Sequence, residues 1–95
     1  MNTEDFLKSL EDDHPPKGLN KLLQALWYDA KSDWEKSHAI ASEIETNDGT
    51  LLHAYLHRKE GDQWNADYWY RRAKSKSPSS DLETEWQELV KKFCE

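Results

Sequence analysis

The chain of 95 residues contains a single cysteine, three glycines and three prolines. One cysteine excludes an internal disulfide and a thiolate-only metal cage, so a reducing cytoplasm is the expected compartment. The glycines stand at positions 18, 49 and 61, too far apart for a glycine-rich phosphate loop. We therefore expect neither nucleotide hydrolysis nor a bound cofactor.

A long hydrophobic run and a basic N-terminus are also missing. Uncharged stretches such as residues 22–28 are far shorter than the ~20 apolar residues that span a bilayer. Residues 1–5 lack the basic start of an export signal, so no membrane partner is expected. The formal net charge of -6 disfavours nucleic acid as a partner. Residues 58–76 nevertheless hold 6 basic groups against 3 acids, enough for a local anion site.

Aromatic side chains and helical spacing are what the chain has in abundance. Five Trp, four Tyr and two Phe, in a chain that is 36% hydrophobic and 34% charged, indicate a small packed core. Apolar residues recur at three- and four-residue steps, which is typical of helices that bury one face. The steps predict helices over residues 3–12 and 17–31, a third from residue 32, a fourth and fifth on either side of residue 61, and a last over 80–95. No strand is predicted.

Capping patterns mark the expected helix ends. Ser32 and Ser80 each stand three residues before a glutamate, which is the pattern of a capping box, so both serines are predicted N-caps. Residues 47–49, Asn-Asp-Gly, read as a turn between helices. Gly61 is expected to end the fourth helix in a left-handed conformation, and Asp62 to cap the fifth.

One stretch, residues 54–78, has small residues, an aromatic ring and a closing proline at regular spacing: Gly61, Ala66, Tyr70, Ala73 and Pro78. This stretch resembles the second half of a tetratricopeptide repeat, and residues 25–44 resemble it more loosely. The resemblance implies antiparallel helix hairpins and, by analogy, a protein-interaction surface. The segment from His53 to Ala73 is also similar to small uncharacterised bacterial helical proteins, which brings no assigned activity.

The prediction is a single all-α domain, residues 1–95, of five to six helices. Its parts are an N-terminal helix with a Pro-Pro turn (1–16), a first hairpin (17–46), a second hairpin (48–77) and a C-terminal capping helix (80–95). Leu22, Ala25 and Asp33 recur 29 residues later in the chain, which supports two hairpins of one design. The first and last helices are expected to cap the stack.

His53 and His57 are four residues apart, so on a helix their rings lie on one side, and two imidazoles at this spacing can hold one zinc ion. The metalloprotease pattern needs glutamate directly after the first histidine, where this chain has Ala54. A third ligand would have to come from a neighbouring helix, from His38, Glu60 or Asp29. Alternatively, the two rings lie in a hydrogen-bonded polar seam between helices and bind nothing.

Two helix registers are open for these histidines. If the repeat spacing is carried back from Ala66, His53 and His57 face the partner helix of the hairpin. If Leu52, Tyr55 and Leu56 form the buried face, the histidines lie on its flank beside Glu60.

An anion site is the other candidate. Arg58, Arg71 and Arg72 lie near aromatic residues in the sequence and could bind a carboxylate or phosphate, although pairs with Asp62 and Asp67 would explain two of them without a ligand. An exposed Trp64 would indicate a partner surface. The candidate ligand-binding residues are therefore His38, His53, His57, Arg58, Glu60, Trp64, Tyr68, Arg71 and Arg72.

From the sequence we expect a non-enzymatic interaction or assembly module, with a protein partner or a second copy of the chain. The alternative is a small ligand- or metal-binding protein centred on His38, His53, His57 and Glu60. Acid-base catalysis by a histidine needs an enclosed pocket, which so short a chain is not expected to form, so no catalytic residue is assigned.

Overall fold

The computed structural model of the protein describes residues 1–94, and within them it contains six α-helices and no strand. The all-α class with five to six helices is thereby confirmed. The helices are α1 (Thr3–Ser9), α2 (Lys21–Ala30), α3 (Trp34–Ser42), α4 (Asn47–Lys59), α5 (Gln63–Arg72) and α6 (Leu82–Phe93).

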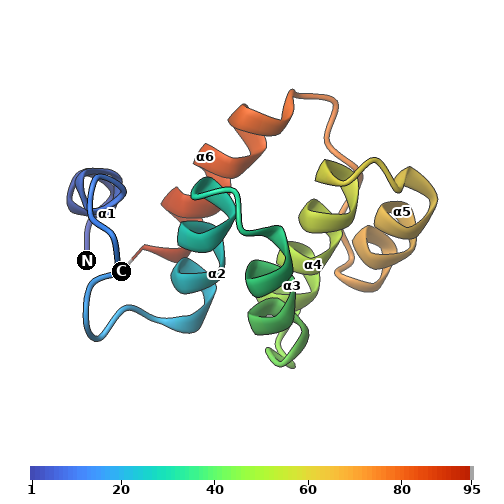
Figure 1. Ribbon diagram of the computed structural model, residues 1–95. Coiled ribbons are helices and arrows are strands. Elements are labelled where there is room, and N and C mark those ends of the chain that lie inside the picture. Colours follow the sequence, from blue (N-terminus) through green and yellow to red (C-terminus); the bar gives the residue numbers. More distant parts are fainter. Residues whose placement is uncertain (95) are drawn as a thin grey trace.

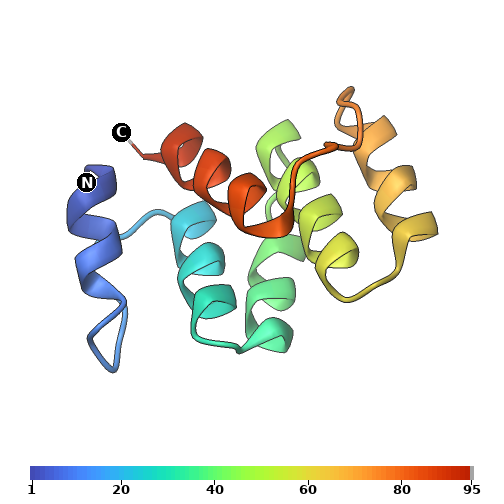
Figure 2. The ribbon, with the colours of Figure 1, turned by 90° about the horizontal axis from the view of Figure 1, so that it is seen from above.

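Four of the helices stand in a row as two hairpins. Helix α2 packs on α3, α4 packs on α5, and α3 packs on α4, so the hairpins meet along α3 and α4 (Figure 1). Helix α1 lies at the end of the row beyond α2, and α6 lies across α2 and α4 (Figure 2). The C-terminal helix therefore shields the first helix of each hairpin, not the outer side of α5.

The main core lies where α1, α2, α4 and α6 meet. Phe6, Leu26, Leu52 and Leu56 are fully buried there, at 0% exposure. A second, smaller cluster joins α4 and α5 through Ala54, Ala66 and Tyr70. Because Ala54 and Ala66 are small and fully buried, the two helices of this hairpin can approach closely at the crossing predicted from the sequence.

Side-chain caps set the helix starts. Asp62 caps α5 by accepting from the amide of Asn65, and Gly61 ends α4 at φ +90°; both predictions are confirmed. The prediction that Ser32 and Ser80 are N-caps is wrong, because the next residues, Asp33 and Asp81, perform this role. An aspartate carboxylate caps as well as a serine hydroxyl, and Ser32 instead takes a left-handed turn at φ +66°.

Four predicted boundaries differ from the structure. Helix α1 ends at Ser9, and α2 begins at Lys21 because Gly18 is left-handed, at φ +78°, and Asn20 is the cap. Residues 47–49 form the first turn of α4 and not a loop, since the hydroxyl of Thr46 accepts from the amide of Gly49. A side chain at position 49 would collide with Ile44, which explains the glycine. Helix α6 ends at Phe93, and Glu95 lies outside the described residues.

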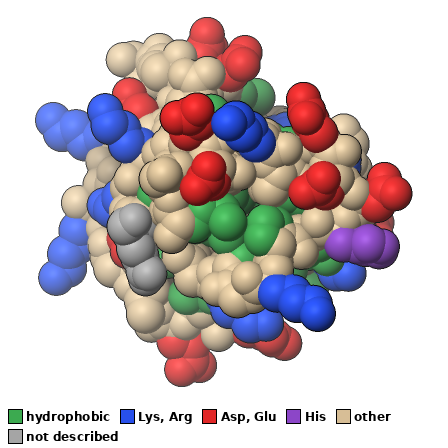
Figure 3. Space-filling view, turned by 90° about the vertical axis from the view of Figure 1, so that its left-hand side faces the viewer, with side chains coloured by type: hydrophobic (Ala, Val, Ile, Leu, Met, Phe, Trp, Pro, Cys, Tyr) green, Lys and Arg blue, Asp and Glu red, His purple; other side chains and the backbone are tan. Residues whose placement is uncertain are grey.

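The surface is uneven in charge. On the face at the α1 end, acidic side chains lie above and to the right of an exposed apolar area, and Lys or Arg side chains also border it (Figure 3). Leu7 of α1 contributes to the exposed apolar surface of the molecule, at 44% exposure. No helix within residues 1–94 is both long and apolar enough to cross a membrane.

Candidate functional site

Three histidines from two helices meet where the hairpins pack together. His38 comes from α3, and His53 and His57 come from successive turns of α4. His38 Nε2 lies 2.9 Å from His53 Nε2. Each of the three residues offers a ring nitrogen, and these nitrogens all lie within 4.8 Å of one another. We call these three residues the histidine cluster.

Two tryptophans hold the rings of the histidine cluster in place. Trp34, one turn before His38 on α3, stacks on it with ring centroids 4.7 Å apart and an interplanar angle of 14°. Trp69 of α5 stacks on His53 at 4.1 Å and 15°. The indole Nε1 of Trp34 also donates to the carbonyl oxygen of Leu56 at 2.9 Å, which fixes the position of the Trp34 ring. The imidazoles are therefore oriented before any ligand arrives.

Glu60 orients the third ring. Its Oε2 lies 2.6 Å from Nδ1 of His57, whose residue is 8% exposed. A carboxylate on one ring nitrogen fixes the tautomer of a histidine and leaves the other nitrogen with its lone pair, as is common behind metal ligands. Glu60 therefore supports the histidine cluster. Asp62 lies close to the same pair but is exposed and caps α5.

The environment keeps two rings of the cluster, those of His38 and His53, uncharged. Burial, followed by the neighbouring His38 and His57 and then Arg72, lowers the pKa of His53 to about 4. Burial, together with the nearby His57, also lowers the pKa of His38, although Glu60 opposes this. At neutral pH both rings are thus neutral imidazoles, which is the form that binds metal ions.

The helix register of α4 follows from burial. Leu52, Tyr55 and Leu56 are 0%, 2% and 0% exposed, so they form the buried face, and His57 lies beside Glu60 on its flank. This is the second of the two registers considered from the sequence. His53 on the same flank reaches Trp69 of the hairpin partner as well as His38 of the other hairpin.

Arg58 is not part of this site. Its Nη1 donates to Glu85 Oε1 at 2.7 Å, and its Nη2 donates to the carbonyl oxygen of Ser80. Tyr70 donates its hydroxyl to the other oxygen of Glu85 at 2.5 Å. The expected pair between Arg58 and Asp62 is absent from the ion pairs of residues 1–94, because Arg58 reaches α6 instead.

The remaining candidates lie on α5 and divide into two groups. The Arg72 guanidinium lies over the Trp69 ring at 4.9 Å from its centroid and 5.9 Å from that of Tyr68, so it extends the stack from His53. Arg71 lines a separate hollow with Tyr70, away from the cluster. The expected Asp67–Arg71 pair is not among the ion pairs of the described residues, since Asp67 accepts from Gln63.

Trp64 and Tyr68 face outward. Trp64 is 80% exposed and Tyr68 is 40% exposed. They are one turn apart on α5, the last helix of the row. Trp27, by contrast, is in the core at 2% exposure, whereas Trp64 contributes to no core cluster of residues 1–94.

A cavity of ≈ 350 Å³ adjoins the histidine cluster. It lies between the end of α3, the start of α4 and the end of α5, and His53, Trp69 and Arg72 are in its wall. Ser42, Thr50 and Glu45 add polar groups. The cluster is therefore next to a space that a small molecule can enter.

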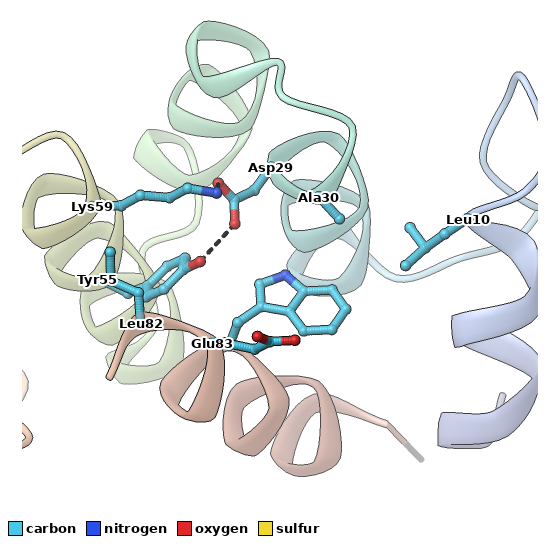
Figure 4. A pocket seen from close by; sticks show the side chains of 8 residues that line it. Leu10, Asp29, Ala30, Tyr55, Lys59, Leu82 and Glu83 are labelled. Atoms are coloured by element: carbon cyan, nitrogen blue, oxygen red, sulfur yellow. Dashed lines mark hydrogen bonds and ion pairs between the residues drawn. The ribbon is translucent and has the colours of Figure 1, made fainter. Parts of the chain in front are cut away.

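A second cavity, of ≈ 430 Å³, lies on the opposite side of α4. Its wall is mainly apolar, but Asp29 is in it, 2% exposed (Figure 4). Asp29 Oδ2 accepts from the Tyr55 hydroxyl at 2.7 Å, and Oδ1 accepts from Lys59 Nζ at 2.8 Å. Sequence reasoning considered Asp29 only as a metal ligand. Its position three residues after Leu26, on an apolar stripe, was the signal for burial.

Comparisons of the chain with protein-family models, with curated proteins and with solved structures return no match. The fold and the site define a small all-α protein in which an aromatic-walled histidine cluster joins two helix hairpins. The tetratricopeptide resemblance stays a prediction, and function has to be inferred from the geometry.

Proposed function

We propose that the protein binds one divalent transition-metal ion, such as Zn²⁺, through His38, His53 and His57. The observation that supports this is the convergence of three ring nitrogens within 4.8 Å. Imidazole nitrogens bind zinc at ~2.0–2.1 Å, so three of them around one tetrahedral ion lie ~3.3 Å apart. The pair at 2.9 Å must therefore separate slightly and give up the proton of its hydrogen bond when the ion binds.

Three further features support the same function. Glu60 on Nδ1 of His57 supplies the carboxylate that commonly stands behind a metal-bound histidine. Trp34 and Trp69 hold the rings of His38 and His53 in place before an ion binds, which lowers the loss of side-chain entropy on binding. The two hairpins each contribute ligands, His38 from the first and His53 and His57 from the second, so the ion would link them.

Cobalt titration tests the proposal, because tetrahedral Co²⁺ reports its ligands by visible absorption. Untagged protein is stripped with a chelator, titrated with Co²⁺, and compared with His38→Ala, His53→Ala, His57→Ala and His14→Ala. His14 lies in the exposed α1–α2 connection and is the matched control. We expect one equivalent of Co²⁺ in the wild type and in His14→Ala, and loss of the tetrahedral spectrum in the other three. Circular dichroism melts of the metal-free variants verify folding.

Two results would contradict metal binding. One is the absence of tetrahedral Co²⁺ absorption in the folded wild type. The other is a spectrum that survives in all three cluster variants, which would place the ion elsewhere.

The interaction module predicted from the sequence is a second candidate, favoured by the exposure of Trp64. Large aromatic rings at the surface are typical anchors of protein interfaces, and Trp64 is 80% exposed with Tyr68 one turn away. Sedimentation equilibrium of the wild type and Trp64→Ala tests self-association through this surface, with Leu7→Ala, at the other end of the molecule, as control. We expect concentration-dependent association that only Trp64→Ala abolishes. A wild type that stays monomeric excludes a second copy as the partner.

A further inference from the structure

We infer that the metal site takes a small carboxylate as an additional ligand, bound in the cavity whose wall contains both His53 and Arg72. This inference rests on the proposed metal function. Three histidines satisfy three positions of a tetrahedral ion and leave a fourth open to water or to a ligand. The cavity of ≈ 350 Å³ has His53 of the cluster in its wall, and it is the space from which we expect a fourth ligand to approach the ion.

Arg72 is the cation of this cavity. Its guanidinium lies over the ring of Trp69, which in turn stacks on His53, so a continuous stack connects Arg72 to the cluster. The ion pairs of residues 1–94 do not include Arg72. The planar guanidinium of Arg72 presents donors in a geometry that matches a carboxylate. Within residues 1–94 its only hydrogen bond is a long one, 3.5 Å, to the Tyr68 hydroxyl.

The other polar groups of the cavity indicate the charge of the ligand. The hydroxyl protons of Ser42 and Thr50 are used, since these residues donate to the carbonyl oxygens of His38 and Thr46. Arg72 is therefore the principal donor toward an anion. Glu45 also lines the cavity and already supplies one negative charge. A singly charged carboxylate fits beside Glu45 better than a doubly charged phosphate, because like charges repel.

The experiment uses acetate as the probe and the Co²⁺-loaded protein as the reporter. Acetate is titrated into the wild type, Arg72→Gln and the matched control Arg71→Gln, with Co²⁺ affinity measured separately for each protein. Arg71 precedes Arg72 on the same helix and lines a different hollow, so its removal changes net charge without touching this cavity. Phosphate at the same ionic strength is the second arm.

We expect acetate to change the Co²⁺ spectrum of the wild type and of Arg71→Gln, and to bind about 10- to 100-fold more weakly to Arg72→Gln, the usual effect of a lost charge-assisted hydrogen bond. Co²⁺ affinity should stay within a few-fold in all three proteins, because Arg72 is not a ligand.

The contradicting outcomes separate the two claims. A spectrum that acetate does not change, or an acetate affinity equal in Arg72→Gln and wild type, overturns the carboxylate site while metal binding stands. A response to phosphate alone overturns the assignment of the ligand as a carboxylate. Absence of Co²⁺ binding overturns both claims.

Discussion

The buried polar side chains on the two sides of α4 have different kinds of partner. On the side that faces α2 and α6, buried Asp29 and Glu85 each accept from a tyrosine hydroxyl and from a cation. On the side that faces α3 and α5, three histidines contact one another between tryptophan walls. On the first side, unlike groups complete each other's hydrogen bonds and hold helices together. On the second, the 2.9 Å contact between His38 Nε2 and His53 Nε2 needs a proton on one of the two nitrogens, which a metal ion would displace.

The carboxylate side is built from two matching networks. Asp29 pairs with Tyr55 and Lys59, and Glu85 pairs with Tyr70 and Arg58. Burial, followed by the adjacent carboxylate, raises the pKa of both tyrosines, so each hydroxyl keeps its proton and acts as a donor. No buried side-chain nitrogen or oxygen within residues 1–94 lacks a hydrogen-bond partner. In the two networks each carboxylate oxygen has a partner inside the protein, as expected of structural groups.

The largest expected effect is on the carboxylate side. Glu85→Ala removes the buried carboxylate that the partly buried Arg58 and the Tyr70 hydroxyl share, and breaking a buried pair in this way costs about 3–5 kcal/mol of unfolding free energy. Urea denaturation measures this loss, and Glu88→Ala, at an exposed position on the same helix, is the control, with a change near zero. Equal stability of the two variants would show that the network does not hold α4 to α6.

The next largest expected effect is the stabilisation of the fold by Zn²⁺ at the histidine cluster. Zn²⁺ at 100 times its dissociation constant should stabilise the wild type by ~2.7 kcal/mol, the value for any ligand that binds only the folded state. Thermal melts with and without Zn²⁺ should show the same shift in Tyr55→Phe, which alters the other side of α4, and none in His53→Ala. A zinc shift that survives in His53→Ala would remove the distinction between the two sides.

The crossing of α4 and α5 is held by apolar packing and can be compared with the two polar sides of α4. Ala66 is fully buried there, so Ala66→Leu should cost about 1–3 kcal/mol by overpacking, and the spread of that range reflects how far the helices can separate. An unchanged melting midpoint would mean that the helices do not cross at this residue. Because Trp69 lies three residues on, Zn²⁺ affinity measured alongside shows whether the second hairpin positions His53.

The smallest expected effect comes from a single hydroxyl. Tyr55→Phe removes one donor from Asp29 but leaves Lys59 in place, so the cost should be about 0.5–1.5 kcal/mol, the net value of a typical hydrogen bond. Tyr28→Phe, at a partly buried position outside both networks, is the control. Urea midpoints that do not differ between the two variants would contradict the role given to the Tyr55 hydroxyl.

The local parts of the fold were predictable from the sequence. Three- and four-residue spacing located all six helices, and Asp62 and Gly61 marked the turn between α4 and α5 correctly. The N-caps of α3 and α6 were each placed one residue early, since serine and aspartate stand side by side and both can cap. Spacing alone does not rank two competent caps.

From the sequence, only site residues that lie on the same helix could be placed relative to one another. The spacing of His53 and His57 shows that their rings share a side of α4, but the distance to His38 depends on how α3 packs on α4. Arg58 was assigned to the site because it lies near aromatic residues in the sequence. Its actual partner, Glu85, is 27 residues away in the chain. Long-range pairing of this kind leaves no local signal in a single sequence.

The most direct test of the central claim is calorimetric titration of Zn²⁺ into untagged, chelator-treated wild type, His38→Ala and His14→Ala. His38 is the one cluster ligand from the first hairpin, so it separates a site shared by both hairpins from a pair of histidines on α4. The account predicts one zinc per chain in wild type and His14→Ala, with markedly weaker binding in His38→Ala. Equal affinity in all three proteins, or no heat of binding in the wild type, would contradict it.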